Sequence, residues 1–191
     1  MSKKKVVYCS SLKDSELKYT EYIDKHIKTV LEMYYAHVNK FKAVFPEVYE
    51  NKALCSRLIN NLRSHDRSKY DPNEFHYYRA RFFPVTSIDY DSEKIKKGFD
   101  MAWLHHAHMN PHHPAYWALA DNGGLIIYDM PDIYIIEMLC DWMAMSKYYN
   151  SSTAEYWKSE SAQKLPMSDY TKSKINEFIE WMYKNNVHAL W

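Results

Sequence analysis

The segment that runs from Pro131 or Asp132 to about Met145 most constrains the fold of this chain. It is apolar on nearly every side, and one stripe of it recurs at helical spacing, namely Ile133, Ile136, Leu139 and Met143. A helix that is apolar all round is buried, so other elements must surround it. The sequence therefore predicts a bundle with this helix near its centre.

The segments on either side supply the surrounding helices. Helical periodicity predicts five further long helices and one shorter one, over residues 15–41, 48–63, 72–82, 92–108, 169–185 and, for the shorter one, 151–164. Ser15 is a typical N-cap for the first of these, and Pro72 suits the first turn of the third. We therefore expect an all-α protein, a compact single-domain bundle of six to eight helices over residues 1–191.

The connecting segments carry little regular structure. Residues 1–14 are expected to be irregular, and residues 112–119 to form a short helical turn. Residues 125–128 are expected to form a short strand or a buried extended segment. Only three glycines occur in 191 residues, which argues against a Gly-rich phosphate loop, a β-meander or a dinucleotide fingerprint.

Charge and cysteine content point away from several other classes. The formal net charge is +1, so no bulk attraction to nucleic acid or to a membrane is expected. No stretch approaches the roughly 20 apolar residues of a membrane span, and no signal peptide is apparent. Three widely spaced cysteines without a CxxC pair are typical of reduced thiols in a cytosolic protein. We expect a cytoplasmic protein whose partner is a small molecule and not a nucleic-acid polymer.

The apolar helix also carries acidic residues that need an explanation. Burying an unpaired carboxylate is costly, so Asp141 must meet a cation or strong hydrogen-bond donors. Glu137 lies one helical turn before Asp141, so the two carboxylates share a face of the helix. Two acids on one face of a buried helix indicate a metal site.

A His-Asp pair, His65-Asp66, stands at the end of the predicted helix 48–63, between His26 in the first helix and Asp141. In this order the chain resembles the HD-domain superfamily, whose signature is a His, a His-Asp pair and a distant Asp, each on a different helix. Its layout is similar to that of the small HD 5′-deoxynucleotidases. It also resembles an uncharacterised group of small phage and bacterial proteins that carry the motifs HDxSKY, HHxxxNPHH and EMxCDW.

This resemblance implies an HD-like fold and a metal-dependent phosphohydrolase whose metal is held by His26, His65, Asp66 and Asp141. Two imidazoles and two carboxylates suit Mn²⁺, Co²⁺, Fe²⁺, Ni²⁺ or Zn²⁺, and the absence of thiolates disfavours a closed structural zinc site. Such an ion lowers the pKa of a bound water and neutralises charge on a phosphoryl group. Asp66 would both bind the metal and orient the attacking water.

A second cluster, from His105 to His113, contains five of the ten histidines of the chain. HD-GYP-type phosphodiesterases insert further histidines between the His-Asp pair and the last Asp to hold a second metal. By that resemblance His105 or His106, with His112 or His113, could hold a second ion, and we take His106, His113 and Glu137 as the candidates. With a single ion, His105 would act as a general acid and His112 would contact phosphate. Both alternatives, one ion or two, stay open at this point.

Further side chains are candidates for contact with a substrate. Lys69 of the HDxSKY motif is the preferred phosphate contact, with a catalytic role in stabilising charge, and Arg79 is a second phosphate contact, because a phosphate-bearing substrate needs cations. Glu74, on the next helix, is a candidate general acid or base. Trp117 could stack on a nucleobase.

The function that the resemblance implies is hydrolysis of a nucleotide phosphate ester, most simply a (deoxy)nucleoside 5′-phosphate. The alternatives are a cyclic (di)nucleotide phosphodiesterase with a dimetal site, a diiron oxygenase, and a non-catalytic nucleotide-binding protein. A homodimer is expected by analogy with HD nucleotidases.

Overall fold

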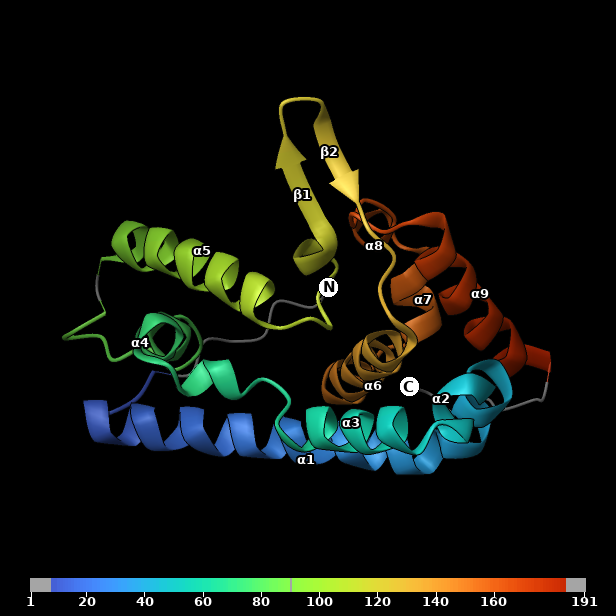
Figure 1. The fold of residues 1–191 in the computed structure, drawn as a ribbon. Coiled ribbons are helices and arrows are strands. Elements are labelled where there is room, and N and C mark those ends of the chain that lie inside the picture. Colours follow the sequence, from blue (N-terminus) through green and yellow to red (C-terminus); the bar gives the residue numbers. More distant parts are fainter. Residues whose placement is uncertain (1–7, 90, 185–191) are drawn as a thin grey trace. The chain divides into compact units, whose positions relative to one another are not determined.

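The computed structural model describes residues 8–89 and 91–184, and in this part of the chain the predicted all-α fold is confirmed (Figure 1). The helices are α1 (Leu12–Val44), α2 (Pro46–Glu50), α3 (Lys52–Arg63), α4 (Pro72–Phe82), α5 (Ser92–Met109), α6 (Asp132–Tyr149), α7 (Thr153–Lys158), α8 (Glu160–Gln163) and α9 (Asp169–Lys184). Two short 3₁₀ helices, η1 (Arg67–Tyr70) and η2 (Pro114–Trp117), and one hairpin of β1 (Ala118–Asp121) and β2 (Gly124–Ile127) complete the elements.

Two of the predicted helices are each divided in the structure, which gives nine α-helices in the described residues. The prediction for 48–63 becomes α2 and α3, because the Asn51 side chain accepts hydrogen bonds from the backbone of Ala53 and Leu54 and caps a new helix. The prediction for 151–164 becomes α7 and α8, because the Ser159 hydroxyl caps α8 through the Ala162 N–H. The last helix was predicted to reach residue 185, which lies outside the described residues.

The predicted start of the first helix is wrong. α1 begins at Leu12, because the Ser11 hydroxyl accepts from the Asp14 N–H at 3.2 Å and takes the capping role expected of Ser15. Residues 12–14 are therefore helical and not irregular, while the predicted irregular residues 1–7 lie outside the described residues. Ser15 is buried inside the helix and donates from its hydroxyl to the Phe83 carbonyl.

The chain divides into two compact units, each built from separate segments. Unit 1 comprises the chain up to Lys25 together with Asp66–Asn110, and unit 2 comprises His26–His65 together with the chain from Pro111 onward. The division falls within α1, between His65 and Asp66, and directly after α5. The predicted single-domain organisation stays a prediction.

Unit 1 is stabilised by aromatic packing and by one buried ion pair. Tyr78 of α4 packs edge-on against Phe99 of α5, with ring centroids 5.0 Å apart. Arg79, also on α4, donates from Nη1 and Nη2 to the two carboxylate oxygens of Asp89 at 2.6 and 2.9 Å, and from Nη1 to the Ser15 hydroxyl at 3.0 Å. Because both side chains of the ion pair are only 1% exposed, this pair links α1, α4 and the following loop in the interior of unit 1.

Unit 2 contains the large apolar core, and α6 lies within it as predicted. Ile135, Ile136 and Leu139 of α6 are completely buried. Phe41 of α1 and Phe178 of α9 stack on each other in the same core, with centroids 4.8 Å apart. An all-round apolar helix can only be accommodated by such packing on several sides, which is why its polar residues have defined partners.

The hairpin of unit 2 partly corrects the prediction for residues 112–128. The expected strand is present as β2, and it pairs antiparallel with β1 in a register that joins Ala118 to Ile127. The helical turn expected over 112–119 is reduced to η2, because the chain continues from Trp117 directly into β1. Gly124, with φ of 118°, makes the turn possible, and all four residues of β2 are exposed, not buried.

The remaining sequence-level expectations concern membranes and cysteines. Among the described helices, none is long and apolar enough to cross a membrane. Cys9, Cys55 and Cys140 are free cysteines, as expected.

Candidate metal centre

In unit 2, two acidic residues of α6 face a group of histidines. Glu137 and Asp141 are four residues apart and lie on one face of the helix, as predicted. His26 comes from α1, His65 follows the C-terminus of α3, and His112 lies in the loop that leads to η2. All three histidines are buried, with exposures of 7%, 1% and 2% respectively.

Glu137 holds two of these histidines through a single carboxylate oxygen. Its Oε1 lies 3.0 Å from Nδ1 of His65 and 3.2 Å from Nδ1 of His112. Burial would raise the pKa of Glu137, but the hydrogen bonds from His112 and His65 outweigh it and lower the pKa to about 2. An ionised carboxylate only accepts hydrogen bonds, so both Nδ1 atoms donate. In a neutral imidazole this assigns the lone pair to Nε2, the atom with which a histidine binds a metal.

Asp141 lies beside these imidazoles. Its Oδ1 is 3.1 Å from Nε2 of His26 and 3.8 Å from Nε2 of His65. Burial would raise the pKa of Asp141, but the hydrogen bond from Nε2 of His26 and the proximity of the His65 imidazole hold it well below its ordinary value. Asp141 is therefore ionised, and the carboxylate that the sequence analysis expected to need a strong partner has one.

The donor atoms of unit 2 are arranged so that they could hold a metal ion. His65, His112 and Asp141 each offer one ligand atom, and these atoms lie within 4.8 Å of one another. The set combines imidazole nitrogen and carboxylate oxygen, which suits a divalent transition ion. Glu137 then occupies the position of a carboxylate that orients metal-binding histidines, an arrangement common in metalloproteins.

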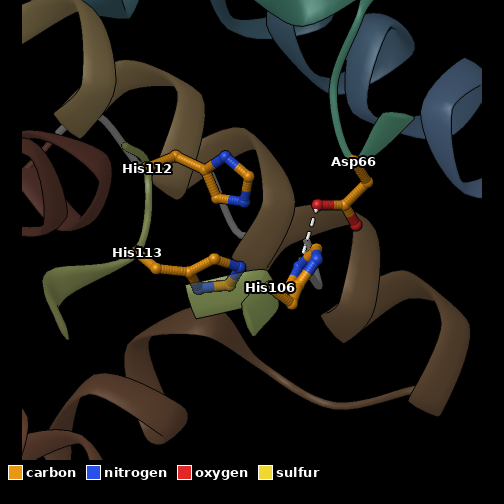
Figure 2. Close-up of side chains that lie close together, drawn as sticks. All are labelled: Asp66, His106, His112 and His113. Atoms are coloured by element: carbon orange, nitrogen blue, oxygen red, sulfur yellow. Dashed lines mark ion pairs between the residues drawn. The ribbon is translucent and has the colours of Figure 1, made fainter. Parts of the chain in front are cut away.

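In unit 1, Asp66 is paired with His106. Asp66 has a left-handed backbone, with φ of 56°, at the turn between α3 and η1. Its Oδ1 lies 3.2 Å from Nε2 of His106 near the end of α5, and both side chains are buried (Figure 2). A left-handed conformation is uncommon for a residue other than glycine, although Asp tolerates it better than most. This turn directs the carboxylate toward α5.

Glu74 orients His106 from the other side of the ring. The Glu74 side chain is fully buried, and its Oε2 lies 2.9 Å from Nδ1 of His106 while its Oε1 lies 2.8 Å from Nδ1 of His105. Burial would raise the pKa of Glu74, but hydrogen bonds from His106, His105 and Ser68 keep it below its ordinary value. His106 thus donates to Glu74 and presents Nε2 to Asp66.

Two residues of this network were missed by the sequence analysis. Ser68 lies 3.1 Å from Nδ1 of His106, and Asn110 donates from Nδ2 to the Ser68 hydroxyl at 2.7 Å and to the His106 carbonyl at 2.8 Å. Ser68 is the serine of the motif HDxSKY, and Asn110 is the asparagine of the motif HHxxxNPHH. Their presence in these motifs was a signal that could have identified them, but roles were predicted only for the histidines, the aspartate and the lysine.

The predicted cations of unit 1 have different surroundings. Lys69 is largely buried, donates to Asp66 Oδ2 at 2.5 Å and lies over the Tyr78 ring at 5.7 Å from its centroid. Arg79 is committed to Asp89 and to Ser15 in the interior. The geometry therefore keeps Lys69 beside the candidate site and does not favour the predicted contact of Arg79 with a substrate.

The predicted residues are thus divided between the two units. His26, His65 and Asp141 of the predicted metal set come together in unit 2, while Asp66 belongs to unit 1, so its sharing of an ion with the other three stays a prediction. His112 lies in the metal-capable group, and its predicted contact with substrate stays a prediction. His113 is half-buried, with its ring centroid 4.3 Å from that of His112 (Figure 2).

Comparisons with known proteins add one match. A family model described as a family of unknown function (DUF5662) matches residues 15–181. No curated protein matches the chain, and no solved structure does. All of the histidines and acidic residues of the two groups described in this subsection lie within the matched range.

Proposed function

We propose that this chain, which belongs to the family of unknown function DUF5662, is a metal-dependent hydrolase of phosphate esters. The observation that carries the proposal is the contact of one ionised carboxylate, Glu137, with two buried histidines beside a second ionised carboxylate, Asp141. This arrangement fixes the tautomer of both imidazoles and gathers nitrogen and oxygen donors. The order of the motif residues, which resembles the HD-domain superfamily, supports phosphate-ester chemistry.

His26, His65, His112 and Asp141 would hold the ion, and the HD resemblance adds Asp66. A divalent ion, when bound, supplies Lewis acidity toward water and toward phosphoryl oxygens. Glu137 contributes by keeping Nδ1 of two imidazoles protonated, so that Nε2 is the binding atom. We expect a transition ion among Mn²⁺, Co²⁺, Ni²⁺, Fe²⁺ and Zn²⁺.

A phosphate substrate also needs cationic groups supplied by the protein. Lys69 is the candidate in unit 1, because its ammonium group is fixed next to Asp66 and is largely buried. A buried ammonium group interacts with an anion more strongly than a solvated one. We propose that Lys69 contacts the phosphate and that Asp66 orients the attacking water.

The simplest substrate is a nucleoside 5′-phosphate, by resemblance to the small HD nucleotidases. A second candidate function is phosphodiester hydrolysis at two ions. It is favoured by a similar order of contacts in the two units. In unit 1 the His106 ring lies between the carboxylates of Glu74 and Asp66. In unit 2 the His65 ring lies between those of Glu137 and Asp141.

The proposal is tested by metal analysis of the purified chain together with phosphate release from a panel of nucleotides. We expect one or two transition ions per chain and metal-dependent phosphate release, lost in His65→Ala and in Asp141→Asn. His108→Ala is the matched control, because His108 belongs to the same histidine run but is exposed. Two irons per chain without phosphate release would favour an oxygenase.

Thermal unfolding shows whether a variant that loses activity is still folded, and whether it still binds metal. A metal that binds only the folded state raises the midpoint of unfolding. We expect this increase in the wild-type chain and in His108→Ala, and its absence in a folded His65→Ala. A chain that binds no metal under any condition would overturn the proposal.

A further inference from the structure

Unit 2 contains a cavity of about 530 Å³ beside the N-terminal end of α6. Its walls come from α2, α3, the start of α6, η2 and the start of α9. Aromatic rings form much of this lining, namely Tyr116, Trp117, Tyr134 and Tyr170. A concave, mostly apolar site with a few polar groups is typical of a small-molecule binding pocket.

Two aromatic rings of the cavity are held in place by hydrogen bonds. The Trp117 indole N–H donates to the Pro111 carbonyl at 2.7 Å, and the Trp117 and Tyr134 rings lie 5.8 Å apart at an angle of 44°. Arg57 donates from Nη2 to the Tyr134 hydroxyl at 2.9 Å, and its guanidinium lies 5.7 Å from the centre of that ring. These contacts fix the orientations of the two rings, and Trp117, which is only partly buried, is the ring that can stack on a planar ligand.

The charged groups of the cavity determine what kind of ligand it accepts. The lining contains two carboxylates, Glu47 and Asp132, and one guanidinium, that of Arg57, which gives these three groups a formal charge of −1. One oxygen of Asp132 already accepts from the Tyr170 hydroxyl at 2.6 Å. A phosphate would be repelled by this excess of negative charge. A neutral heterocycle fits, because carboxylates accept from ring N–H and amino groups while the guanidinium donates to a carbonyl oxygen. Guanine has both kinds of edge, with an amino donor and the O6 acceptor.

The cavity lies next to the metal-capable group within the same unit. Pro111, which lines the cavity, directly precedes His112. Tyr134, Glu137 and Asp141 are spaced by three and four residues, so they follow one face of α6. At 1.5 Å per residue, Tyr134 and Asp141 are about 10 Å apart along the helix axis. One nucleotide has its base and its phosphate at opposite ends of a sugar, which matches this arrangement.

We propose that this cavity binds a nucleobase, with guanine preferred, and so selects the nucleotide whose phosphate is hydrolysed. The inference rests on the proposed function and specifies its substrate class. In this arrangement Trp117 stacks on the base, Glu47 or Asp132 accepts from its N–H groups, and Arg57 donates to O6.

The test is calorimetric titration of the full chain with nucleosides, which carry no phosphate, in the presence of a chelator. We expect guanosine to bind, and inosine, which lacks the amino group, to bind about tenfold more weakly, the usual effect of losing a hydrogen bond to a charged group. Glu47→Gln and Arg57→Ala are each expected to weaken guanosine binding about tenfold. Both residues are exposed, so the fold should tolerate the changes. Glu50→Gln is the matched control in α2, since Glu50 is not part of the lining.

The two proposals fail in different ways. Guanosine binding that is sensitive to Glu47→Gln, without phosphate release from any nucleotide, would keep the base site and overturn the hydrolase. Phosphate release that does not discriminate between bases, and is unchanged in Glu47→Gln and Arg57→Ala, would overturn the base site and keep the hydrolase. Absence of guanosine binding up to its solubility would also overturn the base site.

Discussion

Glu137 in unit 2 and Glu74 in unit 1 make similar contacts with different consequences. Glu137 uses one oxygen, Oε1, for Nδ1 of both His65 and His112, and these two rings therefore converge, with centroids 4.2 Å apart. Glu74 instead uses one oxygen for each of its two histidines. Because one oxygen of Glu137 holds both rings, their metal-binding atoms come together. Glu74, which holds each histidine with a different oxygen, does not bring the metal-binding atoms of its two histidines together.

The histidines of unit 1 are also unequal. His106 is buried and faces Asp66, whereas the His105 side chain is 31% exposed. In addition, Lys69 already balances the charge of Asp66. We infer that the group around Glu137 is the principal metal site.

The largest expected effect concerns the stability of unit 1, because its interior contains the buried ion pair between Arg79 and Asp89. Asp89→Ala leaves the Arg79 guanidinium buried without its partner, which costs about 3–5 kcal/mol. Urea unfolding measures this loss. Glu32→Gln, which removes the exposed partner of Lys147 in unit 2, is the control and should cost less than about 1 kcal/mol. Equal losses of stability in Asp89→Ala and Glu32→Gln would contradict the expected difference between a buried and an exposed ion pair.

The same ion pair predicts a pH dependence. Burial would raise the pKa of Asp89, but the Arg79 guanidinium lowers it below the ordinary value of 3.8. The pair therefore stabilises the fold fully above pH 3.8 and loses this contribution as the pH falls through the lowered folded pKa. Wild type and Asp89→Ala should accordingly approach each other in stability at low pH, as followed by unfolding curves.

The next effect distinguishes the two glutamates by metal affinity. Glu137→Ala removes the acceptor of two imidazole N–H groups, and we expect it to weaken metal binding about 100-fold, the upper end of the range for orienting partners of metal ligands. Competition with a chromophoric chelator gives the affinity. Glu137→Gln retains an oxygen acceptor and should recover part of the loss. Unchanged affinity in Glu137→Ala would exclude the orienting role.

Glu74→Ala is expected to have a smaller effect on metal affinity, about tenfold, because only His106 is directed toward a carboxylate. It should also destabilise the fold by about 1–3 kcal/mol, since a buried N–H loses its acceptor. The same chelator competition and unfolding curves measure both effects. A larger loss of metal affinity in Glu74→Ala than in Glu137→Ala would reverse the comparison and make unit 1 the principal site.

The features that depend on local spacing could be predicted from the amino-acid sequence. The apolar periodicity located α6, and the four-residue interval between Glu137 and Asp141 was enough to place both carboxylates on one face of that helix. Glu74 could only be offered as an acid or base, because its role depends on the packing of α4 against α5. Spacing alone contains no information about such a pairing. The same limit explains why Ser68 and Asn110 were overlooked.

The smallest expected effect separates two roles for His105, which contacts Glu74 like its neighbour but is partly exposed. His105→Ala should change metal affinity by less than about twofold, because an exposed imidazole that leaves Glu74 can be replaced by water. If His105 is instead the general acid proposed from the sequence, the turnover number falls by about 10²–10⁴ while metal affinity stays the same. Measuring both quantities on this variant therefore decides whether unit 1 provides catalysis or only positioning. A loss of metal affinity comparable with that of Glu74→Ala would show that His105 and His106 both support metal binding. The two histidines would then be less different in function than their exposures suggest.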